Sequence, residues 1–186
     1  MVYEDRDALQ PPSTVISFWK QAGPERWFKK DAEFDEAFRT AFSALHFQAA
    51  RRELDHWVKT TDGALALIIL LDQYPRNAFR GTAHMFATDP LARFYARQMV
   101  DAGMDKLVEK SLRTFCYLPF SHSEITCDQR LSLQLNQELD SIRFQWAQKH
   151  ADVIERFSRF PHRNHLLGRI MTFEEEEFLR DGGFAG

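Results

Sequence analysis

The chain has 186 residues, the usual length of a single domain, and its 44% hydrophobic and 13% aromatic content exclude an intrinsically disordered protein. Its formal net charge of −3 lacks the basic excess on which non-specific binding to nucleic acids or anionic membranes depends. We therefore expect one folded domain over residues 1–186, with neither a nucleic acid nor a membrane as its partner.

Three features predict a cytoplasmic protein. The longest apolar run, residues 64–71, is far shorter than the ~20 residues that a transmembrane helix requires. The N-terminal sequence MVYEDRDALQPPS is acidic and lacks the basic and then apolar pattern of a secretory signal peptide. The two cysteines, Cys116 and Cys127, form no CxxC motif, which favours a reducing compartment.

Apolar residues recur at spacings of three and four along most of the chain, which is typical of amphipathic helices, and no segment has the alternation of a strand between hairpin turns. The pattern predicts about eight helices, over residues 12–22, 31–54, 63–73, 89–102, 109–119, 124–138, 141–160 and 172–179. Short connections favour antiparallel packing of neighbouring helices. The expected fold is all-α, a single domain of antiparallel helix pairs, with residues 1–12 as a loosely ordered arm.

Several residues predict where helices begin and end. N-caps are expected at four side chains whose oxygens can accept from free backbone N–H groups: Ser13, Asp31, Asp62 and Thr172. Pro75 and Pro119 each predict a helix end, because proline lacks an N–H and disfavours helical geometry in the residue before it. Helix 63–73 is apolar nearly all round and is expected at the centre of the core.

The remaining helical faces follow from the same periodicity. The phenylalanines and tryptophans on the helical stripes, Phe94 and Trp146 among them, are expected in the core. The acidic run Glu174 to Glu177 is expected to be solvated, at a helix start where the dipole favours negative charge.

Three segments place many polar groups directly after apolar runs: residues 70–81, 115–129 and 157–169. The first and third share a pattern in which an aromatic residue precedes a proline and then an Arg-Asn pair. We hypothesise that all three meet, so that Arg76, Arg80, Arg163 and Arg169 lie against Asp72, Glu124 and Asp128. The candidate ligand-binding residues are Asp72, Gln73, Arg76, Asn77, Arg80, His122, Glu124, Asp128, His162, Arg163, Asn164 and Arg169.

Residues 72–80 have a structural and a functional interpretation. In the structural one, Arg76 donates to the unpaired carbonyls at the helix end and Asn77 adopts the left-handed turn that often follows a helix. Asp72 then pairs with Arg80 or Arg163. In the functional one, the same arginines clamp an anion in a cleft.

Glu124 and Asp128 also carry two interpretations. Four residues apart on a helix, they share a face, so one carboxyl pKa should rise unless an arginine lies between them. They form either an acid–base pair or a fork that binds arginine. Ser121 and Glu124 are additionally spaced as a capping box, which would explain both residues without a functional role.

His162 and His165 have the spacing of half a metal site, which His122 or Glu124 could complete. Arg163 between them disfavours a nearby cation, so no metal is predicted. No nucleophile motif, P-loop or dinucleotide-binding motif occurs, and no cofactor is predicted.

The segments LDQYPRN, FCYLPFSHSE…DQ and RFPHRN…LGR, together with FW at Phe18 and Trp19, WFKKDAEFD at residues 27–35 and the acidic helix start after Thr172, occur in this order along nearly the whole chain. In these motifs the chain resembles the bacterial family catalogued as domain of unknown function 924. The resemblance implies an all-helical fold related to tetratricopeptide-type helix pairs. It implies no activity.

Three function classes remain. The first is a helical protein that binds a small anionic ligand or a peptide carboxylate in a pocket lined by Arg, Glu, Asp and His. The second is a hydrolase-type enzyme with Glu124 or Asp128 as general base and His122 or His162 as general acid. The third is a structural or protein-interaction scaffold in which the polar residues only stabilise the fold. The dominance of arginine and the absence of a nucleophile favour the first.

Overall fold

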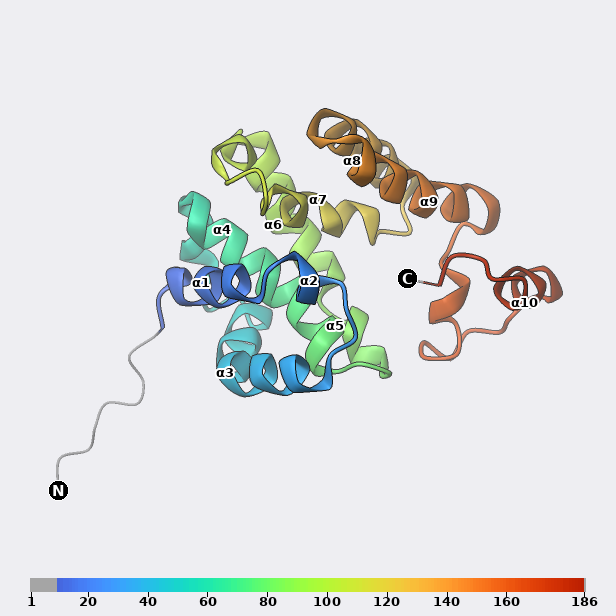
Figure 1. Cartoon of the computed structure of the whole chain (residues 1–186), viewed down its shortest axis with the longest axis horizontal. Coiled ribbons are helices and arrows are strands. Elements are labelled where there is room, and N and C mark those ends of the chain that lie inside the picture. The colour runs from blue at the N-terminus through green and yellow to red at the C-terminus, as the bar shows by residue number, and fades with distance from the viewer. Residues whose placement is uncertain (1–9, 186) are drawn as a thin grey trace, which may run out of the picture.

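The computed structural model describes residues 10–185, which contain ten α-helical segments and no strand (Figure 1). The helices are α1 (Pro12–Ala22), α2 (Pro24–Trp27), α3 (Ala32–Ala50), α4 (Thr61–Ile68), α5 (Tyr74–Ala78), α6 (Asp89–Asp101), α7 (Arg113–Ser121), α8 (Thr126–Leu139), α9 (Ser141–Phe157) and α10 (Phe173–Arg180). The predicted all-α class is confirmed. The predicted arm at residues 1–12 lies mostly outside the described residues, and Pro12 already begins α1.

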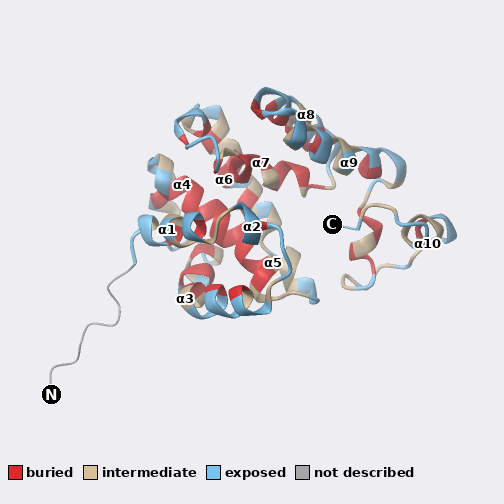
Figure 2. Cartoon of the chain, viewed as in Figure 1, coloured by how far each residue is buried: buried red, intermediate tan, exposed pale blue. Residues whose placement is uncertain are grey.

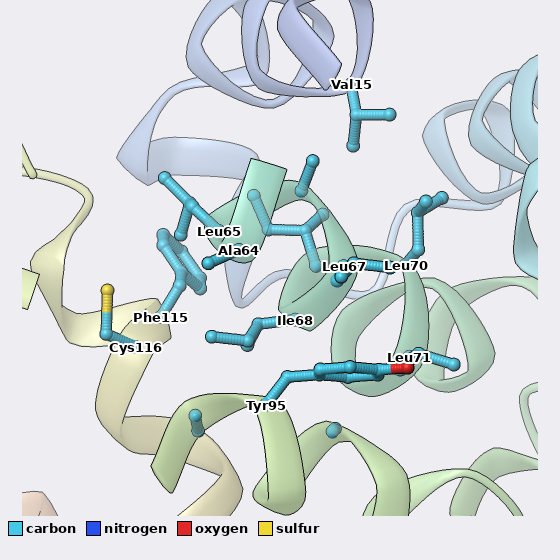
Figure 3. Packing of buried hydrophobic residues seen from close by; sticks show 14 of the residues in the cluster. Val15, Ala64, Leu65, Leu67, Ile68, Leu70, Leu71, Tyr95, Phe115 and Cys116 are labelled. Carbon is cyan, nitrogen blue, oxygen red and sulfur yellow. The ribbon is translucent and has the colours of Figure 1, made fainter. Parts of the chain in front are cut away.

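The apolar helix α4 is the centre of the core. All of its residues from Gly63 to Ile68 are buried, and α1, α6 and α7 pack around it. Figure 3 shows Val15 of α1, Tyr95 of α6 and Phe115 of α7 on different sides of this helix. The prediction that its uniformly apolar surface marks a central position is confirmed.

Consecutive helices pack in pairs from α6 to α9. Helix α6 packs on α7, α7 on α8, and α8 on α9, and only Asp140 separates α8 from α9. Figure 2 shows buried residues concentrated in α4 to α7, while exposed residues cover much of α8, α9 and α10. A second, small apolar cluster around Val153, Ile154 and Phe160 joins α9 to the C-terminal segment.

Asp31 and Thr172 are confirmed as N-caps. Asp31 accepts from the backbone N–H of Phe34 at 3.1 Å, and Thr172 forms a capping box with Glu175. Glu175 is nevertheless buried rather than solvated, because its carboxylate binds Arg159 at 2.6 and 2.7 Å.

The other two predicted caps are wrong. Ser13 lies inside α1, which begins at Pro12 without a side-chain cap. The cap of α4 is Thr60 rather than Asp62, and its hydroxyl accepts from the N–H of Gly63 at 3.1 Å. Gly63 permits this close turn, because a Cβ there would lie 2.1 Å from the carbonyl oxygen of Trp57.

Pro75 does not end the helix, contrary to the prediction. After α4 the chain widens into a π-helical turn, Ile69–Gln73, in which the N–H of Tyr74 bonds to the carbonyl of Ile69, five residues back. The helix then continues through Pro75 as α5. The wider turn accommodates a residue that supplies no N–H to the preceding carbonyls.

The last four carbonyls of this turn accept hydrogen bonds from side chains. Leu70, Leu71, Asp72 and Gln73 accept from His46 Nδ1 at 2.9 Å, Thr88 Oγ1 at 2.5 Å, Arg76 Nη1 at 2.7 Å and Asn77 Nδ2 at 2.9 Å, respectively. The predicted donation by Arg76 is confirmed. The predicted left-handed Asn77 is wrong, because this residue is helical within α5.

Pro119 also lies within its helix rather than ending it, and α7 runs on to Ser121. Proline removes only its own hydrogen bond to the carbonyl four residues back, which the last turn of a packed helix tolerates. Two aromatic residues expected in the core are largely exposed: Phe94 is 46% and Trp146 is 50% accessible. None of the described helices combines the length and the apolar content needed to span a bilayer.

The side-chain donors of the π-helical turn can be tested at Thr88. The substitution Thr88→Val removes the donor to the Leu71 carbonyl and leaves the side-chain volume nearly unchanged. We expect the free energy of unfolding to fall by about 1–2 kcal/mol, the usual consequence of leaving one buried polar group unpaired. A urea denaturation followed by circular dichroism measures this.

Thr82→Val is the matched control, because Thr82 is exposed and bonds only to the Phe79 carbonyl in a surface turn. It should change the unfolding free energy by less than about 0.5 kcal/mol. If both substitutions lowered the unfolding free energy equally, the π-helical turn would have no special requirement for side-chain donors.

Candidate functional site

A cavity of about 640 Å³ lies between two groups of elements. One wall is formed by the residues at the end of α2, the π-helical turn, α5 and α7, and the other by α9 and residues 160–166. Phe184 and Ala185 also contact the cavity.

The described residues that line this cavity carry positive charge and no carboxylate. Five lining side chains are cationic: Lys29, Arg76, Arg80, Arg143 and Arg163. Unpaired cations near one another raise the energy of the folded protein unless an anion compensates them. The number of carboxylate partners that each cation already has therefore decides what the cavity can bind.

Arg76 and Arg80 have strong partners. Arg76 donates to both carboxylate oxygens of Asp89 at 2.7 and 2.9 Å, and Arg80 to both oxygens of Asp35 at 2.7 and 2.8 Å. Arg76 also lies 3.3 Å from Asp72. Such bidentate pairs fix the orientation of the guanidinium groups.

Arg163 is less well compensated, although it is only 6% exposed. Its one carboxylate contact among the described residues is a 3.4 Å bond from Nη1 to Asp89, which Arg76 already occupies, and its buried Nε has no partner. Its guanidinium carbon lies 4.6 and 4.5 Å from the ring centres of Phe86 and Phe160. Burial, together with the charge of Arg76, lowers the pKa of Arg163 to about 10.

Arg143 and Lys29 extend the positive wall toward the surface. No salt bridge joins either side chain to a carboxylate within residues 10–185, and the guanidinium of Arg143 lies 5.6 Å from the ring centre of Phe28. Arg143, Trp146, Ala147 and His150 recur at helical spacing on α9, so one face of this helix lines the cavity along its length.

Asp72 and His122 form a hydrogen-bonded pair at the wall. Asp72 is fully buried, and its Oδ1 accepts from His122 Nδ1 at 2.7 Å while its Oδ2 accepts from Gln73 at 2.6 Å. Burial alone would raise the pKa of Asp72, but Arg76 and His122 outweigh it and hold that pKa well below its usual range. Burial, and then the charge of Arg76, lower the pKa of His122.

Two further histidines beside this pair are neutral at physiological pH. The Nδ1 of His150 bonds to the Trp146 carbonyl at 2.8 Å, and the ring centres of His150 and His122 are 5.9 Å apart. Burial and the neighbouring His122 lower the pKa of His150 to about 3. Burial and Arg163 lower the pKa of His162 to about 4.

Seven of the twelve sequence-predicted binding residues line the cavity: Gln73, Arg76, Asn77, Arg80, His122, His162 and Arg163. Asp72 lies directly behind His122. Outside the lining are Glu124, Asp128, Asn164 and Arg169. Asn164 is fully buried and donates to Glu175 at 3.3 Å.

Glu124 and Asp128 do not face one another, because Glu124 precedes α8 and binds a different partner. Glu124 accepts two bonds from Arg169 at 2.8 Å and one from the Phe160 N–H. Asp128 contacts Arg93 and Arg97. Both carboxylates bind arginine, as one of the two interpretations of the sequence predicts. They do not form a shared acid–base site.

The predicted Ser121–Glu124 capping box is also wrong. The hydroxyl of Ser121 is buried against that of Ser132 at 2.6 Å, and α8 begins after Ile125 without a side-chain cap. Ser123 accepts from the Ile125 N–H and donates to Asp128 instead.

The three polar segments do meet, in part through the expected groups: Arg76 lies 3.3 Å from Asp72 and Arg169 binds Glu124, whereas Arg80 and Arg163 pair with none of the three expected acids. His122 binds Asp72, and Glu124 binds Arg169, which joins the second segment to the first and third. Asp72 pairs with neither Arg80 nor Arg163. Two acids outside the segments take that role: Asp89 for Arg76 and Arg163, and Asp35 for Arg80.

Sequence reasoning missed Asp35, Asp89, Arg143 and His150. Asp89 is recognisable only as a helix start, and Asp35 only as a polar residue of an amphipathic helix. The spacing of Arg143, Trp146 and His150 is a usable signal, since three polar or amphipathic side chains on one helical face are unusual for a core stripe. Within the described residues, no three His, Cys, Asp or Glu side chains cluster closely enough to hold a metal ion.

The ion pair of Glu124 with Arg169 allows a test of its structural role. The substitution Glu124→Gln removes the charge that joins residues 122–124 to residues 160–169. We expect it to lower the unfolding free energy at neutral pH by about 1–2 kcal/mol, measured by urea denaturation. Glu138→Gln, which disrupts a pair with Lys106 that is half-exposed on both sides, is the matched control and should cost less than about 0.5 kcal/mol.

The pH dependence of this difference has a defined sign. Burial alone would raise the pKa of Glu124, but its bonds from Arg169 and the Phe160 N–H lower it. The ion pair therefore makes its full contribution to the unfolding free energy at pH values above the pKa of Glu124 in the unfolded chain. This contribution disappears as the pH falls through the lower pKa of Glu124 in the folded protein. A difference that persists unchanged into strong acid would contradict the ion pair as its cause.

Comparisons with known proteins agree with this fold. The family model described as a bacterial protein of unknown function (DUF924) matches residues 15–183. A solved structure of a protein of unknown function from Agrobacterium tumefaciens is 51% identical in sequence, with a TM-score of 0.90, and the match covers 92% of this chain and 97% of that one. No curated protein matches the chain. The chain therefore belongs to the DUF924 family of bacterial proteins, whose function is not known.

Proposed function

We propose that this protein binds a small anionic ligand in the cavity beside Arg163. The observation that carries the proposal is the lining of the cavity, in which five cationic side chains and no carboxylate of the described residues face a common space. Among residues 10–185, only three carboxylates, those of Asp35, Asp72 and Asp89, contact these five cations. An anion would compensate the remaining positive charge.

The partners of the arginines support a division of roles. Arg76 and Arg80 are held by bidentate carboxylates and keep the wall in place. Arg163 has an unpaired Nε, and its 3.4 Å contact is to Asp89, which also binds Arg76. Arg163 therefore has the greater capacity to donate hydrogen bonds to an anion. Its position between Phe86 and Phe160 restricts the side chain, so little conformational entropy is lost when an anion binds.

The volume of the cavity and its aromatic residues support a ligand larger than a bare anion. The space of about 640 Å³ is in the range of small-molecule sites, and Trp27, Phe28 and Trp146 contact it together with Phe86 and Phe160. The ligand would place its charged group near Arg163 and an apolar part along the aromatic residues. The hydrolase alternative with Glu124 or Asp128 as base gains no support, because both carboxylates lie outside the lining.

Anion binding can be tested with Arg163→Met, which keeps the length and apolar contacts of the stem. Isothermal titration calorimetry with inorganic phosphate and with benzoate should show that the wild type binds at least one of these anions. Loss of a charge-assisted hydrogen bond should weaken the affinity of the variant by about tenfold or more. Because Arg163 is incompletely paired, the unfolding free energy of the ligand-free variant should stay within about 1 kcal/mol of wild type.

Arg159→Met is the matched control, because Arg159 pairs with Glu175 outside the cavity. Its anion affinity should equal that of the wild type. An Arg163→Met variant that is strongly destabilised and binds both anions normally would support the scaffold interpretation and contradict the proposed site.

A further inference from the structure

We propose that the charged group of the ligand carries a proton, as hydrogen phosphate or the singly ionised form of a phosphomonoester does, and donates a hydrogen bond from it to Nε2 of His122. This inference rests on the proposed anion site and narrows its ligand from anions in general to protonated phosphoryl groups. It depends on which nitrogens of the cavity histidines are free and on what surrounds them.

The hydrogen bond to Asp72 fixes the proton on His122. A buried, ionised carboxylate can only accept, so Nδ1 of His122 carries the hydrogen in their 2.7 Å bond. In the neutral ring Nε2 then keeps its lone pair. No group of the described residues bonds to Nε2, and the ring contacts the cavity.

His150 repeats this arrangement with a backbone partner. The Trp146 carbonyl accepts from Nδ1 at 2.8 Å, which leaves Nε2 of His150 as a second acceptor near the first ring. Both rings are fixed in the same tautomer by groups outside the cavity. Beside the arginines, the wall therefore offers lone pairs as well as donors.

Burial, and then the charge of Arg76, lower the pKa of the His122 ring. The Nη1 of Arg76 lies 3.3 Å from the same Asp72 oxygen that accepts from His122. The titratable and charged groups that surround the ring from all neighbouring elements are Asp72, Arg76, Asp89, His150, His162 and Arg163. When the histidines are neutral, this set holds two cations, Arg76 and Arg163, and two carboxylates, Asp72 and Asp89. Burial rather than net charge therefore opposes protonation of His122 from solvent.

A site that places fixed nitrogen lone pairs beside arginines distinguishes anions that carry a proton from anions that do not. Hydrogen phosphate can place its oxygens on the arginine and its O–H on Nε2. Sulfate has the same shape and charge but no proton, so one of its oxygens would face a lone pair. Carboxylates are likewise fully deprotonated at neutral pH. A binding site built for a ligand hydroxyl rejects an analogue without it, because the buried partner is left unpaired.

The test compares inorganic phosphate with sulfate on the whole chain by isothermal titration calorimetry. At mildly alkaline pH both anions are doubly charged, and only phosphate carries a proton. We expect phosphate to bind at least about tenfold more tightly than sulfate. Lowering the pH supplies the missing proton from solvent, so the sulfate affinity should rise and the preference for phosphate should shrink.

His122→Asn should reduce the preference for phosphate to within about twofold and leave the sulfate affinity nearly unchanged. His56→Asn is the control, because His56 lies in the turn before α4, outside the cavity lining. If His122→Asn does not fold, the wild-type comparison still decides the question. ¹⁵N NMR adds an independent readout, since phosphate and not sulfate should shift the Nε2 resonance of His122.

The outcomes separate the two proposals. Equal affinities of the wild type for phosphate and sulfate overturn the protonated ligand and leave the anion site standing. Binding of benzoate without phosphate does the same. If none of these anions binds, both the anion site and its refinement fail.

Discussion

The buried backbone carbonyls of the π-helical turn Ile69–Gln73 are the constraint on which the site depends. Pro75 supplies no N–H, so the backbone hydrogen bond that it would donate is missing, and side chains donate to four of the carbonyls before it. Those donors come from α3, from the start of α6 and from α5 itself, through His46, Thr88, Arg76 and Asn77. Satisfying the backbone thereby ties three helices to the end of the central helix.

This constraint explains why the most apolar segment of the chain ends in polar side chains. Helix α4 is buried all round and cannot move without opening the core. Arg76 bonds to the carbonyl of Asp72 in the π-helical turn and to the carboxylate of Asp89 at the start of α6. One side chain therefore completes the backbone and forms part of the cavity wall. The structural and functional interpretations of these residues are compatible, because rigidity of the wall is a requirement of a binding site.

The sequence predicted the helices of this fold more securely than the residues at which they begin, end or connect. The periodicity of α3 and α9 and the uniformly apolar α4 depend on burial alone, which a sequence displays directly. Pro75 and Pro119 were misleading because proline propensity is a local rule, and here side-chain donors and tertiary packing outweigh it. Thr60 rather than Asp62 caps α4, because the Thr60 hydroxyl accepts from the Gly63 N–H, whereas propensity allows either residue as the cap.

The cavity was partly predictable for the same reason. Proline followed closely by arginine and asparagine marks both segments that supply Arg76 and Arg163, and both side chains do reach the cavity. Their shared partner Asp89 was not predictable, because ion pairing between distant segments leaves no local pattern. The wall contributed by α9 was missed because Trp146 was assigned to the core, whereas it is half-exposed at the cavity.

Arg76 and Arg163 converge on the single carboxylate of Asp89, with the ring of Phe86 against both guanidiniums. These two cations repel each other, and Arg163 is the less compensated of them, because Arg76 also lies 3.3 Å from Asp72. Burial, and then the charge of Arg163, lower the pKa of His162 to about 4. The folded chain bears this electrostatic cost because the central helix and its carbonyl donors hold the groups in place. An anion beside Arg163 would attract both guanidinium groups and so offset the repulsion between Arg76 and Arg163. Ligand binding would then stabilise the fold at the point where the ligand-free protein is least compensated.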